Sequence, residues 1–167
     1  DNVDPLFTLG MAASEELAIL AEEGNPGPLA GFYDGAEGVL SVVASTDGAP
    51  TFVGEKLVIP VTVTKNYPYV TIASMAINTN DCFVAINGVK LSQGDRITGS
   101  GYDAGSEENN ELCSSIPGPA CPADSGNIRS GDGEGVVHIH RGFFGVGDLP
   151  QAGYDWRNPM LLVEVSK

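Results

Sequence analysis

The chain has 167 residues, of which 42% are hydrophobic and 18% charged, a composition that suits one folded domain and argues against a disordered or coiled-coil chain. Its 22 acidic residues outnumber 8 basic ones, giving a net charge of −14 without any basic cluster, so nucleic acid is not an expected partner. No stretch is long and apolar enough to predict a transmembrane segment. We therefore interpret residues 1–167 as a single domain.

The first predicted element is a helix over residues 6–23. Ser14 is a suitable N-cap, and Leu17, Leu20 and Ala21 share one face after it. The run Gly24-Asn25-Pro26-Gly27-Pro28 predicts a sharp end to this helix.

The rest of the chain has the pattern of short strands, and Asn87-Gly88 predicts a hairpin turn between two of them. Residues 99–135 are predicted to be one long loop region that is rich in acids. Six or seven short strands with one helix favour an all-β fold, an antiparallel β-sandwich with long loops. The predicted strands are residues 39–44, 56–64, 69–77, 83–86, 136–139 and 159–165.

An acidic loop over residues 101–111 carries four acids and two amides around a glycine. Calcium takes six to eight oxygen ligands from carboxylates, amides and backbone carbonyls, and such a loop supplies several of them. Composition alone still favours a solvated acidic loop over a calcium site. Asp81 follows a predicted strand, and the simpler interpretation is that it belongs to a turn at the strand end. The alternative is that its carboxylate binds the same calcium ion as Asp103.

The pair His138 and His140 on a predicted strand is an alternative metal site. Alternate strand residues face one way, so copper or zinc could bind both imidazoles, although a hydrogen-bonded or surface pair is the commoner arrangement. The sequence has no G-x-S-x-G, H-E-x-x-H or phosphate-binding glycine loop, and we predict no catalytic residues and no enzyme.

Three cysteines bear on the compartment. Cys113 and Cys121 flank a short loop of turn residues, which predicts a local disulfide and an oxidising environment. Cys82 lies in an apolar run and is predicted to be a buried free thiol.

A set of short motifs, in this order, resembles the spondin N-terminal domain family in its bacterial form, over nearly the whole chain. The motifs are Leu6-Phe7-x-x-Gly10, Ala13-Ser14-x-x-Leu17, Leu20-Ala21-Glu22-x-Gly24, Ser74-Met75, Asn80-Asp81-x-Phe83-Val84, Tyr102-Asp103-Ala104-Gly105-Ser106-Glu107, Val137-His138-Ile139-His140, Gly147-Asp148-Leu149 and Asp155-Trp156-x-Asn158-Pro159.

The resemblance implies an eight-stranded antiparallel sandwich similar to calcium-dependent lipid-binding domains, with calcium at one end. It implies Asp81, Asp103 and Glu107 as ligands, helped by the backbone around Ala104 and by Asn109. It also implies an extracellular module for adhesion or assembly on a bacterial surface or matrix, either secreted or held at the cell surface or in the periplasm.

One departure from the family concerns the start of the chain. Family members usually have a strand before the Leu-Phe-x-x-Gly segment, whereas only residues 1–5 precede Leu6 here. The missing strand would leave an open sheet edge, and such an edge is a template for strand addition. We therefore predict association with another protein, or self-association, through this edge.

Overall fold

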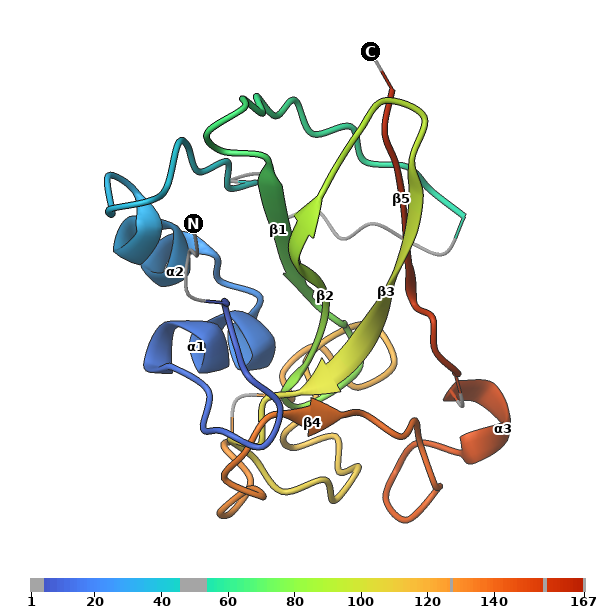
Figure 1. Ribbon diagram of the computed structural model, residues 1–167. Helices are drawn as coiled ribbons and strands as arrows, with labels where there is room; N and C mark the ends of the chain where they lie inside the picture. The colour runs from blue at the N-terminus through green and yellow to red at the C-terminus, as the bar shows by residue number, and fades with distance from the viewer. Residues whose placement is uncertain (1–4, 46–53, 127, 155, 167) are drawn as a thin grey trace.

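The computed structural model of the protein describes residues 5–45, 54–126, 128–154 and 156–166 (Figure 1). Asp155, which opens the last motif of the family resemblance, lies outside the described residues. Eight elements follow one another along the chain: α1 (Glu15–Glu23), α2 (Gly27–Tyr33), β1 (Tyr69–Met75), β2 (Cys82–Lys90), β3 (Arg96–Asp103), β4 (His138–Ile139), α3 (Gln151–Tyr154) and β5 (Leu161–Glu164).

The five strands form one antiparallel sheet with β3 at its centre. Strands β1, β2, β3 and β4 are neighbours in that order, and β5 also pairs with β3. The two halves of β3 have different neighbours, since its residues 96–99 pair with β5, whereas residues 102–103 pair with β4. The antiparallel, β-rich fold is therefore confirmed. The described residues form a single sheet, and the second sheet of a sandwich stays a prediction.

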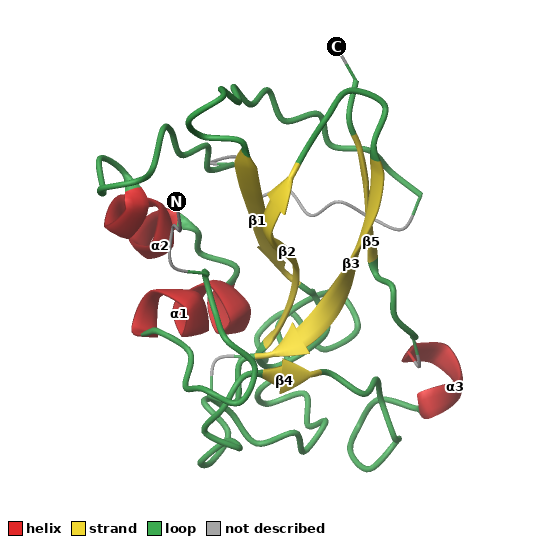
Figure 2. Ribbon diagram, viewed as in Figure 1, coloured by secondary structure: helices red, strands yellow, loops and turns green. Residues whose placement is uncertain are grey.

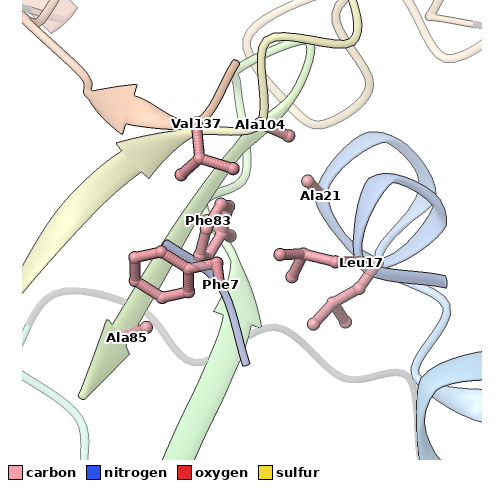
Figure 3. Packing of buried hydrophobic residues seen from close by; sticks show 8 residues of the cluster. Phe7, Leu17, Ala21, Phe83, Ala85, Ala104 and Val137 are labelled. Atoms are coloured by element: carbon pink, nitrogen blue, oxygen red, sulfur yellow. The ribbon is translucent and has the colours of Figure 1, made fainter. Parts of the chain in front are cut away.

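Helix α1 covers the β1 side of the sheet and completes the core. Its N-cap is Ser14, whose Oγ accepts a hydrogen bond from the backbone N–H of Leu17 at 3.2 Å, as predicted. The buried face of α1 packs against a set of apolar side chains from the sheet and the N-terminal segment (Figure 3). In this core, the rings of Phe7 and Phe83 meet edge to face with their centres 5.2 Å apart.

The predicted helix is too long at its N-terminal end. Residues 6–13 are not helical, because their backbone forms hydrogen bonds with the segment before β4. The N–H of Gly10 donates to the carbonyl of Val137, and the N–H of Val137 donates to the carbonyl of Met11. Helix α2 was not predicted. It begins immediately after its N-cap residue, Pro26. Pro28 lies in its first turn, where a proline is well tolerated because its missing N–H would have no partner within the helix.

The predicted hairpin turn at Asn87-Gly88 is wrong. Strand β2 continues through both residues, and its register with β1 shifts between Val70 and Ile72. The left-handed φ of +63° at Gly88 is typical of a bulge, and its N–H donates to Thr71 Oγ1 at 2.8 Å. Asn87 and Gly88 form a bulge and not a hairpin turn, because β2 already has β1 as its antiparallel partner.

Strand β3 was missed, since residues 99–103 were predicted to be loop. Glycines at positions 99 and 101 suggested a turn, but they serve close packing inside the sheet. A Cβ on Gly99 would lie 2.5 Å from the carbonyl oxygen of Ala85, and one on Gly101 would approach Met160 Sδ and the ring of Trp156.

Two predicted strands are wrong. Residues 39–44 and 56–64 have no ladder partner in the described part of the chain and are coil. The predicted strands at 69–77, 83–86, 136–139 and 159–165 correspond to β1, β2, β4 and β5, with shifted ends. Among the described residues, no helix has the length and apolar character that a membrane span requires.

Candidate metal centre

The lower end of the sheet gathers two carboxylates and one imidazole. Asp103 ends β3, and His138 begins β4 directly opposite it in the ladder. Glu134 precedes His138 by four residues, and one ligand atom from each of the three lies within 4.8 Å of the others. We call Asp103, Glu134 and His138 the acidic centre. Figure 2 shows long loops around this end of the sheet.

His138 stands between the two carboxylates of the acidic centre. Its Nε2 atom lies 3.7 Å from Oδ1 of Asp103 and 3.6 Å from Oε2 of Glu134. The imidazole is about one-third exposed, whereas Asp103 is fully buried. The acidic centre therefore has one deeply placed ligand group and two that reach it from nearer the surface.

Asn109 joins the two carboxylates on another side. Its Nδ2 donates to Asp103 Oδ2 at 2.6 Å and to Glu134 Oε1 at 3.1 Å. A half turn of this amide would present its oxygen to a cation in the same place. Burial acts to raise the pKa of Glu134, but hydrogen bonds from its own backbone and from Asn109, together with His138, lower it below the usual value.

Asp81 lies beside the acidic centre and is fully buried. Its Oδ2 accepts hydrogen bonds from the backbone N–H groups of Ser106 and Glu107, at 2.8 and 2.9 Å, and from the Ser106 hydroxyl. Its Oδ1 is buried and has no hydrogen-bond partner in the part of the chain that the structure describes. Burial raises the pKa of Asp81 to about 7, and the nearby charge of Asp103 adds to this effect.

Glu107 is a third buried carboxylate in this region. Its Oε1 accepts the backbone N–H of Ser130 at 3.3 Å. Burial raises its pKa to about 7, and the charge of Glu22 on α1 raises it further. Arg129 is the nearby basic residue, but it is largely exposed; its Nη2 lies 3.3 Å from Glu22 Oε1 and donates to the carbonyl of Ser106.

The predicted ligands divide into two sets. Asp103 and Asn109 meet at the acidic centre, and His138 of the alternative site joins them. Asp81 and Glu107 lie outside the group of three but next to it, and their role as ligands stays a prediction. Ala104 is buried, and its N–H donates to the backbone carbonyl of Asp81 at 3.0 Å.

Sequence reasoning missed Glu134, although a local signal was present. Glu134 lies within a run of glycines, Gly131-Asp132-Gly133-Glu134-Gly135, that has no strand or helix pattern. Its spacing of four residues before His138 was the available clue. The loop can approach so closely because Gly133 has no side chain: a Cβ there would lie 2.4 Å from the carbonyl oxygen of Gly105.

His140 does not join His138 in one site. Its Nδ1 accepts the backbone N–H of Gly142 at 3.0 Å, and its ring lies over Trp156 with the ring centres 4.9 Å apart. Burial lowers the pKa of His140. Among the described residues, the group with metal-ligand spacing does not include it, so the two imidazoles have different surroundings.

The cysteines are arranged as predicted. Cys113 and Cys121 form a disulfide across eight residues of sequence, and Cys82 is a free, buried cysteine. Burial raises the pKa of the Cys82 thiol well above its usual value.

No family model matches the chain, and no curated protein gives a significant match. The resemblance to the spondin N-terminal domain family therefore stays a prediction.

Proposed function

We propose that this protein is a calcium-binding adhesion or assembly module that works outside the cytoplasm. The observation that carries the proposal is a pair of fully buried neighbouring carboxylates, Asp81 and Asp103, with no Lys or Arg partner in the described part of the chain. Such a pair is costly to bury while both members are charged.

A bound cation would remove this cost. Calcium prefers carboxylate and amide oxygens and tolerates irregular geometry. Asp103 and Glu134 provide carboxylate oxygens within one small region, and Asn109 would add its amide oxygen after a half turn of the amide. Oδ1 of Asp81, which has no partner among the described residues, is a further oxygen ligand close by. In the role proposed here, the ion joins the acidic loop to the segment before β4.

His138 supports a second candidate, a transition-metal site. An imidazole with two carboxylates suits zinc, manganese or iron better than calcium, because those metals accept nitrogen ligands readily. Copper or zinc held by both histidines is less well supported, since His140 faces Trp156 and Gly142.

The test is thermal unfolding of the purified, chelated protein with calcium, manganese, zinc or copper added back singly. At a concentration about 100 times its dissociation constant, a bound ion adds about 2.7 kcal/mol, or roughly 5 to 10 °C for a chain of this size. Asp103→Asn should abolish the shift, whereas Asp124→Asn, at an exposed loop position, should retain it. No shift with any of the four ions would overturn the proposal.

A His138 substitution then distinguishes the metals. His138→Gln should weaken zinc or manganese binding by tenfold or more, and leave calcium binding nearly unchanged, because calcium has little preference for nitrogen. Titration calorimetry of both proteins measures this difference. Loss of calcium binding in His138→Gln would contradict a calcium site built on carboxylate and amide oxygens, and unchanged zinc and manganese binding would contradict the transition-metal site.

The extracellular part of the proposal is supported by the Cys113–Cys121 disulfide, since such bonds persist in oxidising compartments. Adhesion or assembly is tested separately, by whether beads coated with the protein cluster in calcium and disperse in chelator. Beads that stay dispersed in calcium would remove the adhesive role and leave cation binding intact.

A further inference from the structure

The segment just before β1 exposes an unusual run of apolar side chains. We call residues 57–63, of sequence Leu-Val-Ile-Pro-Val-Thr-Val, the apolar run. The exposed fraction of its side chains ranges from 39% for Ile59 to 86% for Val58. Such a concentration of exposed Leu, Ile and Val marks an interaction surface more often than a bare loop.

The backbone of the apolar run also lacks hydrogen-bond partners among the described residues. Its residues form no hydrogen bond with any other part of the chain that the structure describes; the neighbouring contact is a turn between Thr64 and Tyr67. Figure 1 draws the run as coil leading to β1. β-Branched residues with free N–H and C=O groups are the usual template for adding a strand.

We propose that the apolar runs of two copies of this chain pair as antiparallel strands about a two-fold axis at Pro60. In an antiparallel ladder, positions alternate between hydrogen-bonded and non-hydrogen-bonded pairs. Pro60 opposite itself occupies a non-bonded pair, where its missing N–H costs nothing. The hydrogen-bonded pairs are then Ile59 with Val61, and Leu57 with Val63, and all four residues have N–H groups.

The charges beside the run select this arrangement. In antiparallel pairing centred on Pro60, Lys65 lies opposite Glu55 of the second copy, and Lys56 lies opposite Thr64. Parallel pairing in register would instead place Lys56 and Lys65 of one chain opposite the same lysines of the other chain. Because like charges directly opposite each other destabilise a ladder and opposite charges support it, the antiparallel form is favoured.

Each copy contributes the same segment, the apolar run, so the interface is isologous. Val58 and Thr62 face each other across the two-fold on the other side of the ladder. The pairing is independent of the acidic centre, so a monomeric protein that still binds calcium would overturn this proposal alone.

The first test compares two proline variants by sedimentation velocity over a range of protein concentrations. Val61→Pro removes an N–H that the ladder uses, whereas Thr62→Pro removes one that points away from it. Neither N–H has a partner in the described part of the monomer, so both variants should fold alike. We expect a wild-type dimer, a dimer for Thr62→Pro, and dimerisation weakened at least tenfold for Val61→Pro.

The second test uses charge reversal. Lys65→Glu places two acids opposite each other and should weaken the dimer, and adding Glu55→Lys should restore it. A wild-type monomer at every concentration, equal effects of the two prolines, or no rescue by the double reversal would each overturn the proposed register. Ile128→Lys, at an exposed apolar position elsewhere, should leave the dimer unchanged and controls for a general loss of hydrophobic surface.

Discussion

Asp81 should make the stability of the metal-free protein depend on pH. Its pKa rises from the ordinary value of 3.8 to about 7 on folding, because the carboxyl group is buried and faces Asp103. The unfolded chain releases this proton near pH 4, whereas the folded chain holds it until about pH 7. The folded state therefore binds more protons between these values, and the free energy of unfolding falls as the pH rises.

The size of the effect follows from the shift. Each pH unit within this window is worth about 1.4 kcal/mol, so Asp81 contributes a loss of about 2 to 3 kcal/mol between pH 5 and pH 7. Asp81→Asn removes the titration, and its amide oxygen can still accept the backbone N–H groups of Ser106 and Glu107.

Urea unfolding in the presence of chelator measures both proteins at pH 5 and pH 7. The wild type should lose about 2 to 3 kcal/mol more than Asp81→Asn over this interval, and Asp124→Asn should behave as the wild type does. The comparison uses the change in the free energy of unfolding with pH, so a constant change in stability caused by the substitution does not affect it. Equal slopes for wild type and Asp81→Asn would refute the assignment of a raised pKa to this group.

Three further predictions concern the scaffold. Gly99→Ala should lower the free energy of unfolding by about 1 to 3 kcal/mol, because the new Cβ would lie 2.5 Å from the carbonyl oxygen of Ala85; an unchanged urea midpoint would contradict the close approach of β2 and β3. Gly31→Ala, within α2 and with no atom within 4 Å of the new Cβ, should instead add about 0.5 to 1 kcal/mol, measured by the same unfolding curves. Replacing Cys113 and Cys121 with Ser should cost about 2 to 3 kcal/mol through lost loop constraint, and thermal unfolding that matches the oxidised wild type would contradict this.

Local signals in the sequence predicted the elements whose structure is decided locally. Ser14 caps α1 as expected, because a serine hydroxyl satisfies a backbone N–H that the helix leaves free. The disulfide was likewise predicted from short spacing and turn residues. In both cases the deciding partners lie within a few residues of each other.

Long-range pairing decided the elements that were predicted wrongly. Gly99 and Gly101 resemble turn residues until β2 lies beside them. Asn87-Gly88 resembles a hairpin turn until β1 pairs with β2 on both sides of these two residues. Residues 56–64 have a clear strand pattern but no partner in the described chain. Strand propensity reflects fit to a neighbour more than an intrinsic backbone preference.

The candidate site shows the same division. The density of acids and amides predicted Asp103 and Asn109, which do meet. Glu134 joins them only because β4 pairs with the end of β3, a register that the sequence pattern does not reveal. In the structure, Asp81 and Glu107 lie close to the acidic centre but do not belong to its group of three residues.

The pairing of β3 with β5 along one half and with β4 at the other end has a consequence for how the chain reaches its native state. Half of β3 pairs with β5, whose residues 161–164 lie more than sixty positions further along the chain. A ribosome must therefore have synthesised the chain through residue 164 before that edge can close. Contacts so distant along the chain are slow to form, which favours late completion of the sheet.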